Sequence, residues 1–292
     1  MKITVVGFGY IGSVISAVLC EAGHNVNAIE QNKKVIDNIN NRIFNIPEPS
    51  LEELVFSAID SKHLKITDSY EDVPSSDVIL VTVGTPLSEE YDADLSALEG
   101  VFEELSSLVK DGQIVMIKST VPPGVTRMLK EKFFDSDSKV LIAFSPERLA
   151  EGDAINQLKE LPIIVGGINH ESTEACSNFW KETLATEVIS VSSSEAAELV
   201  KLADNQWIDL NIALANELAL LCDSLNMGID VLEVISAANS LKKGTHYVNI
   251  LSPSIGVGGY CLTKDPWFIH SLAKKNNLAL GLPSAARTAN DL

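Results

Sequence analysis

The sequence predicts an α/β protein in which a Rossmann-like, doubly wound parallel sheet is followed by an all-helical central domain with one long helix. Three observations predict this fold class: a glycine-rich turn near the N-terminus, short apolar runs that alternate with helical patterns, and one long uninterrupted helical pattern. With 292 residues the chain exceeds the usual size of a single core. We therefore expect two domains, over residues 1–193 and 194–292.

The glycine-rich turn lies between a β-branched run and an apolar helical run. It reads Gly7-Phe8-Gly9-Tyr10-Ile11-Gly12, and the next strand-like run ends at Glu30. Gly7 permits the turn, Gly9 lets a pyrophosphate approach the helix N-terminus, and Gly12 allows the helix to pack closely on the strand. Glu30 can accept hydrogen bonds from the adenosine ribose, and its charge repels a 2′-phosphate. The pattern predicts a domain that binds NAD in preference to NADP.

Short apolar runs rich in β-branched residues continue the predicted sheet. They occupy residues 77–83, 113–117 and 140–144, with one or two further strands at 163–167 and 188–191, and helical patterns at about 95–109 and 125–134. Polar loops follow the first three runs, at 84–86, 118–124 and 145–148. Ligands of open α/β sheets bind at the carboxyl ends of the strands, so we expect these loops to converge on one cleft.

A single helical pattern runs from Glu195 to Leu225 without proline or glycine, and a helix-stop signal follows it at 226–228. Apolar residues cover much of its circumference, so we expect it to be buried on more than one side, to join the domains and to form a homodimer interface. Lys201, Asn205 and Asp209 are spaced four apart and share one face. Taken alone, such a face is typical of solvated surface.

One cysteine, Cys261, lies in the glycine-rich segment 256–266, beside Lys264 and Asp265. A nearby cation favours the thiolate, which is the nucleophilic form, so the segment is compatible with catalysis. A tight turn next to a buried structural cysteine is the alternative. The other cysteines, Cys20, Cys176 and Cys222, are widely scattered, which argues against a disulfide framework and against a metal site.

Composition restricts the class of partner. The formal net charge is −18, which argues against nucleic acid or an acidic membrane surface as a partner. No apolar run is long enough to span a bilayer without charges. We expect a cytoplasmic enzyme that attracts an anionic substrate locally, through helix N-termini and a few well-placed basic side chains.

Six motifs, in this order, resemble those of the UDP-glucose/GDP-mannose dehydrogenase family. They are the glycine turn at 7–12, Gly84-Thr85-Pro86, the loop 119–124, the loop 145–152, Lys201 with Asn205, and the segment 258–265. The resemblance implies oxidation of C6 of a nucleotide sugar from alcohol to carboxylate, with two NAD and one cysteine. Family members carry a third, Rossmann-like domain that helps to hold the nucleotide, and we expect this C-terminal domain to be absent from the present chain.

The resemblance also implies roles for individual residues. Lys201 or Asp265 acts as the base for the first oxidation, and Cys261 captures the resulting aldehyde as a thiohemiacetal. Lys201 and Asn205 stabilise its oxyanion. Thr120, Glu147 and Asp265 position and activate the water that hydrolyses the thioester. The cofactor-binding residues implied are Gly7, Gly9, Tyr10, Ile11, Gly12, Glu30, Thr85, Thr120 and Lys264. The substrate-binding residues implied are Glu147, Arg148, Glu151, Lys201, Asn205, Ser254 and Gly258.

Two residues bear on the sugar. At the position of Arg148 the sequence resembles family members that act on UDP-N-acetylhexosamines such as UDP-N-acetylmannosamine. Glucose-type members tend to have phenylalanine at this position. Tyr260, where other members have histidine, favours UDP-glucose. We favour a UDP-N-acetylhexosamine and keep UDP-glucose as the alternative. A β-hydroxyacid dehydrogenase, which would not depend on Cys261, and a non-catalytic NAD-binding, dimerising fragment are the two rival interpretations.

Overall fold

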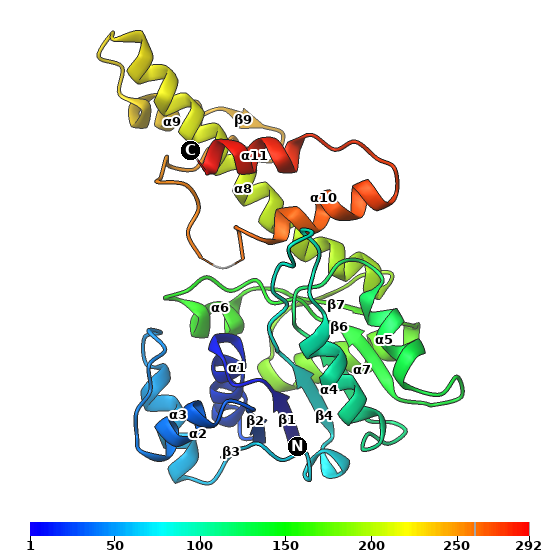
Figure 1. Cartoon of the computed structure of the whole chain (residues 1–292). Coiled ribbons are helices and arrows are strands. Elements are labelled where there is room, and N and C mark those ends of the chain that lie inside the picture. The colour runs from blue at the N-terminus through cyan, green and yellow to red at the C-terminus, as the bar shows by residue number, and fades with distance from the viewer. Residues whose placement is uncertain (260, 292) are drawn as a thin grey trace. The chain divides into compact units, whose positions relative to one another are not determined.

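The computed structural model describes residues 1–259 and 261–291 (Figure 1). It divides into two compact units: Met1–Thr85 with Asp94–Lys201, and Pro86–Ala93 with Leu202–Leu292. Helix α8 (Ser194–Leu225) contributes residues to both units. The boundary between residues 193 and 194 that the sequence suggests therefore stays a prediction.

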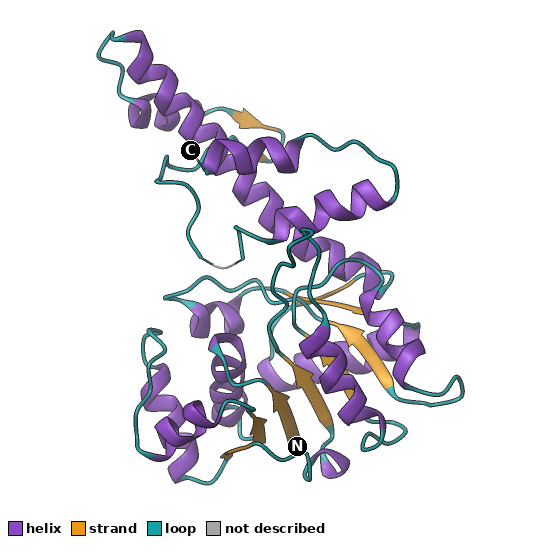
Figure 2. Cartoon of the chain, viewed as in Figure 1, coloured by secondary structure: helices purple, strands orange, loops and turns teal. Residues whose placement is uncertain are grey.

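An eight-stranded sheet forms the centre of the first unit, with strand order β3-β2-β1-β4-β5-β6-β7-β8 (Figure 2). Its strands are β1 Lys2–Val6, β2 Asn25–Ile29, β3 Leu64–Thr67, β4 Val78–Val81, β5 Ile114–Ile117, β6 Leu141–Phe144, β7 Ile163–Gly167 and β8 Val188–Ser190. The strands from β3 to β6 are parallel, β7 pairs antiparallel with β6, and β8 is parallel to β7. The doubly wound α/β prediction is confirmed. Apolar runs do not encode strand direction, so the reversal at β7 was not predicted.

Side chains of β4 show how the sheet is buried on both faces. Val78 and Leu80 belong to the same core cluster as residues of helices α1, α3, α6 and α7, whereas Ile79 and Val81 belong to a second cluster with residues of α4 and α5. Successive strand residues point to opposite faces, so a strand covered by helices on both sides must be apolar throughout. The helices of this unit are α1 Tyr10–Glu21, α2 Lys33–Asn40, α3 Leu51–Asp60, α4 Ser96–Ser106, α5 Val125–Phe133, α6 Ala154–Glu160 and α7 His170–Leu184, with a 3₁₀ turn at Val73–Ser75.

The first turns of α8 are joined to α5 by two carboxylates. Glu198 is fully buried and accepts hydrogen bonds from the backbone N–H groups of Gly124 (2.6 Å) and Thr126 (2.7 Å). Glu195 accepts from Nε of Arg127 at 2.6 Å. The first amides of a helix lack intrahelical partners, so Glu198 satisfies groups that would otherwise be orphaned at the start of α5.

The described residues of the second unit form mainly helices, together with a two-stranded hairpin and an isolated β-bridge between Leu87 and Ala93. Its elements are the remainder of α8, α9 Val231–Ala238, β9 Lys242–Lys243, β10 His246–Tyr247, α10 Asp265–Lys275 and α11 Leu282–Asn290. Helix α8 ends where the sequence predicts, because Asn226 (φ 51°) and Gly228 (φ 68°) adopt the left-handed conformation. The loop 86–93 belongs to this unit and packs on α10, where Asp92 pairs with Lys275 at 2.9 Å.

Within the part of the chain that the structure describes, no helix combines the length and apolar character needed to cross a membrane.

Candidate active site

The turn between β1 and α1 requires glycine at two positions. Gly7 has φ +96°, and its N–H donates to the carbonyl of Ile29 at 2.8 Å, which places the turn beside the end of β2. A Cβ on Gly12 would lie 1.9 Å from the carbonyl oxygen of Gly7. Since no side chain tolerates that distance, glycine at both positions allows the helix to start directly over the strand end.

The same turn fits a dinucleotide. The space in which a Cβ on Gly9 would lie is open, and no described side chain caps α1, so its first N–H groups can bind a phosphate. Glu30 lies beside the turn, where its carboxylate accepts from the N–H of Phe8 at 3.0 Å and from the N–H of Asn32 at 2.8 Å. A pyrophosphate on α1 and a ribose at Glu30 are the contacts that this arrangement suits.

Tyr10 and Ile11 form the first turn of α1, and both pack partly against the core. The hydroxyl of Tyr10 donates a hydrogen bond to Glu48, so a cofactor contact by Tyr10 would use its backbone.

Loops at the carboxyl ends of β4, β5 and β6 bring several predicted residues together in the first unit. Thr85 is buried, and its hydroxyl donates to the carbonyl of Thr120 at 2.6 Å, which ties the loop after β4 to the loop after β5. Glu147, after β6, is also buried. Its Oε1 accepts from the N–H of Leu149 at 2.5 Å, while Oε2 has no hydrogen-bond partner among the described residues. A buried carboxylate oxygen with spare acceptor capacity can hold a water or a substrate hydroxyl.

Lys118, at the end of β5, is a buried cation that the sequence analysis did not single out. Its exposed fraction is 4%, and its Nζ lies 5.0 Å from the ring centroid of Trp180. Burial lowers the pKa of Lys118 to about 8. The nearby Glu147 carboxylate opposes this shift, whereas the positive charges of Lys201 and Arg148 add to it. Lys118, Lys201 and Arg148 are therefore close enough for their charges to interact, with Glu147 as a nearby carboxylate.

The polar face of α8 is buried. Lys201, Asn205 and Asp209 are 7%, 6% and 0% exposed, so the solvated surface that their spacing alone suggests is not what forms. Nδ2 of Asn205 donates to Oδ2 of Asp265 at 2.5 Å. Lys264 pairs with Oδ1 of the same carboxylate at 2.5 Å. Asp265 is fully buried; the two donors satisfy both of its oxygens, and Lys264 compensates its charge.

Cys261 is exposed, and its loop is tied to the start of α10. Its carbonyl accepts from the N–H groups of Lys264 (3.1 Å) and Asp265 (2.9 Å). The buried ion pair Lys264–Asp265 is therefore held within one turn of the cysteine. Burial raises the pKa of Cys20 to about 12 and also raises the pKa of Cys176, so both of those thiols stay protonated.

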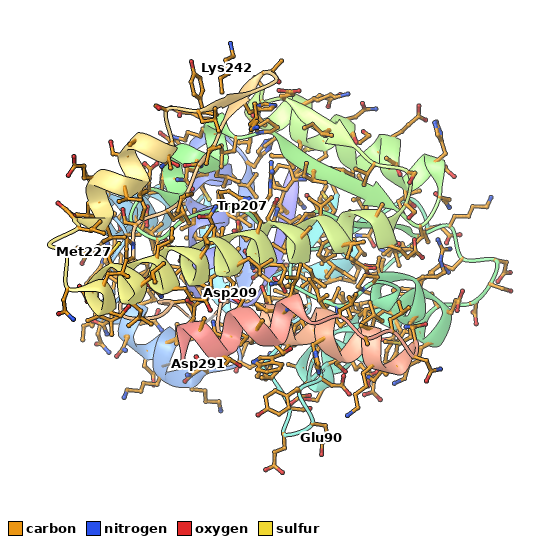
Figure 3. All side chains as sticks on the ribbon, turned by 90° about the horizontal axis from the view of Figure 1, so that it is seen from above. Glu90, Trp207, Asp209, Met227, Lys242 and Asp291 are labelled. Atoms are coloured by element: carbon orange, nitrogen blue, oxygen red, sulfur yellow. The ribbon has the colours of Figure 1, made fainter. Side chains whose placement is uncertain are left out.

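A second buried network, which the sequence analysis missed, supports the same loop from α11. Arg287 is 2% exposed and donates to Asp209 at 2.7 Å and to the carbonyl of Leu262 at 3.3 Å. Nδ2 of Asn290 donates to the side chain of Asp209 at 2.8 Å. Figure 3 shows Asp209 on the side of α8 that faces α11, with Trp207 on another side. The residue after Cys261 is thus fixed by a guanidinium.

The remaining predicted substrate residues lie in loops. Ser254 donates its N–H to Oδ1 of Asn216 at 2.8 Å, and Gly258 faces open space. Glu151 is exposed in the loop before α6. The sugar preference suggested by Tyr260 falls on a residue outside those that the structure describes. No group of three or more His, Cys, Asp or Glu within the described ranges could hold a metal ion.

Comparison with known proteins covers both units. Residues 1–184 match the NAD binding domain of the UDP-glucose/GDP-mannose dehydrogenase family, and residues 195–292 match its central domain. A UDP-N-acetyl-D-mannosamine dehydrogenase of Methanococcus maripaludis strain C7 is 36% identical over 99% of this chain, which spans 65% of that relative's length.

Two solved structures are similar over nearly the whole chain. The UDP-D-ManNAc dehydrogenase of Pyrococcus horikoshii superposes with a TM-score of 0.89 at 33% identity, covering 100% of this chain and 68% of that one. A UDP-glucose dehydrogenase of Pyrobaculum islandicum gives a TM-score of 0.88 at 27% identity, covering 99% of this chain and 68% of that one.

Replacing Glu30 should weaken NAD binding. In Glu30→Ala a ribose loses a charged acceptor, and such a hydrogen bond contributes roughly 1.5–3 kcal/mol, which corresponds to a Kd raised about tenfold to a hundredfold. Titration calorimetry with NAD measures the change, and Glu103→Ala, which removes an exposed carboxylate of α4, serves as the control. An unchanged Kd in Glu30→Ala would refute the ribose contact.

Proposed function

The chain belongs to the UDP-glucose/GDP-mannose dehydrogenase family, and from that premise we propose that it oxidises C6 of a UDP-sugar to the carboxylate. The reaction removes four electrons in two steps and proceeds through a covalent adduct on Cys261. NAD, when bound at the glycine turn, supplies the hydride acceptor for each oxidation. The sugar we propose is a UDP-N-acetylhexosamine such as UDP-N-acetylmannosamine.

The observation that supports this proposal most strongly is the setting of Cys261. It is exposed, unlike the buried Cys20 and Cys176, and its backbone is bonded to the start of α10. The first residue of that helix, Asp265, is buried between Asn205 and Lys264. An exposed cysteine whose backbone is bonded to the turn that carries a fixed cation and a fixed carboxylate suits nucleophilic catalysis.

In the first oxidation we assign the base to Lys201 or Asp265. Either group takes the proton of the C6 hydroxyl, directly or through a water, as the C–H bond gives up its hydride. The product is an aldehyde. Lys201 is nearly buried in the first unit, and Asp265 is fully buried in the second, so each is shielded from bulk solvent.

In the second stage the thiolate of Cys261 adds to the aldehyde carbon. A carbon–sulfur bond forms, the carbonyl π bond breaks, and the oxygen becomes an oxyanion that Lys201 and Asn205 stabilise. Loss of a second hydride from the same carbon converts this thiohemiacetal into a thioester. Covalent capture keeps the reactive aldehyde bound between the two oxidations, which explains why the reaction needs a cysteine.

Hydrolysis then releases the acid. Water adds to the thioester carbon, the carbon–sulfur bond breaks, and Cys261 is regenerated as the leaving group. We assign the positioning and activation of this water to Thr120, Glu147 and Asp265. The buried Oε2 of Glu147 has no hydrogen-bond partner among the described residues. This supports a role in which it accepts a hydrogen bond from the attacking water.

The stoichiometry of the reaction tests the covalent route. The wild-type protein should release two NADH per UDP-sugar, whereas Cys261→Ala should lose uronate formation by roughly a thousandfold or more because the nucleophile is absent. NADH absorbance and product chromatography measure both quantities. Cys222→Ala, at a half-buried cysteine on α8, should behave as wild type. Normal uronate formation by Cys261→Ala would remove the covalent step.

Two observations support the proposed preference for a UDP-N-acetylhexosamine: the residue Arg148 and the substrates in the names of similar proteins. Arg148 lies in the loop after β6, and its guanidinium donates to the carbonyl of Pro162, so its position is fixed. The relative from Methanococcus maripaludis and the similar structure from Pyrococcus horikoshii are both described as acting on UDP-N-acetylmannosamine.

A panel of UDP-sugars tests this preference. We expect kcat/KM for UDP-N-acetylmannosamine to exceed that for UDP-glucose by roughly tenfold or more, since a substituent in a pocket contributes about 1–3 kcal/mol of discrimination. NADH release under identical conditions gives both values. A higher kcat/KM with UDP-glucose would contradict the assignment.

We further propose a homodimer in which a second copy of the chain covers α8. Trp207, Leu214 and Leu221 are 50%, 46% and 53% exposed and are spaced seven apart, so they form one apolar stripe along the helix. An exposed stripe of this kind on a long helix is typical of an interface between helices.

A charge in the stripe should separate the two copies. Leu214→Glu places a carboxylate in the proposed interface, where an unpaired buried charge is strongly unfavourable, so we expect a monomer. Sedimentation velocity measures the mass, and Asp223→Asn, two residues beyond the stripe's Leu221 and therefore on another side of α8, should leave the dimer intact. A wild-type protein that sediments as a monomer would contradict the proposal.

A further inference from the structure

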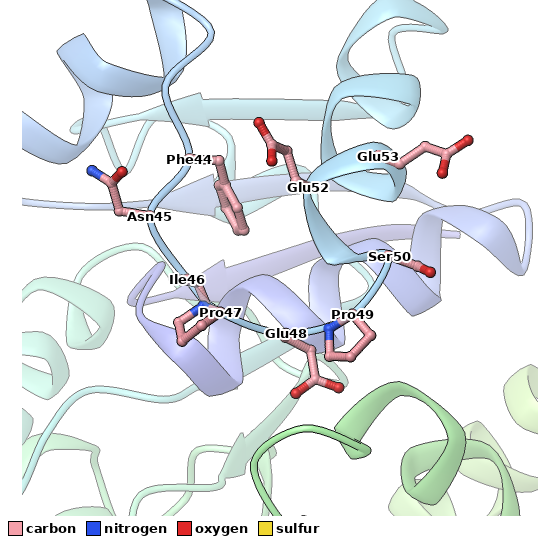
Figure 4. A pocket seen from close by; sticks show the side chains of 9 residues that line it. All are labelled: Phe44, Asn45, Ile46, Pro47, Glu48, Pro49, Ser50, Glu52 and Glu53. Carbon is pink, nitrogen blue, oxygen red and sulfur yellow. The ribbon is translucent and has the colours of Figure 1, made fainter.

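Glu48 is a buried carboxylate outside all the predicted site residues. It lies in the loop between α2 and α3, and its exposed fraction is 6%. Figure 4 shows this loop, with Glu48 directed away from Glu52 and Glu53. Loop carboxylates are ordinarily exposed, so burial of this one requires partners that replace its hydration.

The partners of Glu48 come from two separate segments. Oε2 accepts from the hydroxyl of Tyr10 and from the N–H of Gly152 at 2.7 Å. Oε1 accepts from the N–H of Ala154 at 2.8 Å. Tyr10 is the first residue of α1 and belongs to the glycine turn, and Gly152 and Ala154 bracket the start of α6. One carboxylate therefore joins the cofactor-side helix to the loop that follows Arg148.

The loop held by Glu48 contains the predicted sugar-side residue Glu151. Gly152 has φ +92°, so the chain turns sharply at the residue that donates to Glu48. A further hydrogen bond, from the N–H of Ala150 to Gln157 at 2.7 Å, fixes the loop to α6 itself. The bonds to Glu48, together with the packing of Leu149 against the core, tie this loop to other parts of the unit, whereas the bond from Ala150 ends on the adjoining helix.

We propose that Glu48 is a positioning residue that holds the loop 149–153 in the conformation required to bind the nucleotide sugar. The inference rests on the proposed function for the identity of the ligand. Glu48 does not contact the ligand; it acts through the backbone of Gly152 and Ala154. The hydroxyl of Tyr10 supplies the third hydrogen bond to the carboxylate. The side chain of Tyr10 therefore supports the loop 149–153, while its backbone belongs to the glycine turn.

The chemistry of Tyr10 agrees with this role. Burial and the adjacent Glu48 raise the pKa of Tyr10, so its hydroxyl keeps the proton that it donates. A phenol and two amides supply three donors to two oxygens, which satisfies a buried carboxylate without a cation. Glutamine in place of Glu48 would present one acceptor oxygen and one NH₂ donor, so it cannot accept from both amides as the carboxylate does.

Calorimetry on purified protein separates this role from cofactor binding. In Glu48→Gln we expect the Kd for UDP-N-acetylmannosamine to rise about tenfold or more, from the loss of a charged hydrogen bond that orders the loop. The Kd for NAD should stay within about twofold, since binding groups at the glycine turn are intact. Tyr10→Phe, which removes one donor and keeps the ring, should raise the UDP-sugar Kd by a smaller factor.

Amide hydrogen exchange gives a readout that does not depend on the ligand. In Glu48→Gln the amides of residues 149–154 should exchange faster, by about tenfold or more, while those of β1 and β4 keep wild-type rates. Glu52→Gln, an exposed carboxylate a few residues along the chain, is the matched control and should change neither exchange nor binding. Because neither measurement needs turnover, an inactive wild-type protein would contradict the proposed function and not this inference.

Three results would overturn the proposal. Unchanged exchange of 149–154 in both Glu48→Gln and Tyr10→Phe would show that the loop does not depend on the carboxylate. Faster exchange with an unchanged UDP-sugar Kd would show that loop position does not affect binding. Equal losses of UDP-sugar and NAD affinity would indicate a general structural role. If Glu48→Gln fails to fold, the same three comparisons are made on Tyr10→Phe.

Discussion

A stripe of buried polar side chains along α8 is the constraint on which the candidate site depends. Glu198, Lys201, Asn205 and Asp209 are each less than 10% exposed. An unsatisfied buried polar group costs about 1–3 kcal/mol, more if it is charged, so such groups require hydrogen-bond partners. Glu198 finds the amides at the start of α5, and Asn205 finds Asp265. The helix therefore fixes the elements that carry the proposed chemistry by their polar groups as well as by packing.

Two neighbouring acids on α8 show how strongly the local partner decides the charge. Burial raises the pKa of Glu198 to about 7, although two backbone amides donate to it. One turn earlier, the hydrogen bond from Arg127 lowers the pKa of Glu195 to about 2. Glu195 is about one third exposed and faces a guanidinium, whereas Glu198 is fully buried and accepts hydrogen bonds from backbone N–H groups. A net charge of −18 therefore says little about the charge at any one site.

Much of the fold is visible in the sequence because it depends on local pattern. The glycine turn at 7–12, the apolar strands and the extent of α8 all follow from residue types that are close together in the chain. The site is less predictable, because its partners are remote. Asp209 and Arg287 are 78 residues apart, and Gly152 lies 104 residues from Glu48. No local periodicity relates such pairs, so their burial and their roles emerge only from tertiary structure.

The resemblance to the family identified candidate site residues that local sequence pattern could not identify. It identifies only some kinds of residue, for a physical reason. It pointed to Lys201, Asn205 and Asp265. Their spacing in the sequence, taken alone, would not have suggested that these side chains are buried. It did not point to Lys118, Arg287 or Glu48, which act on neighbouring groups and backbone. A residue that contacts a ligand leaves a recognisable motif, because ligand chemistry restricts its type and spacing. A residue that only holds a loop is restricted by the donors around it, and those donors are assembled by the fold.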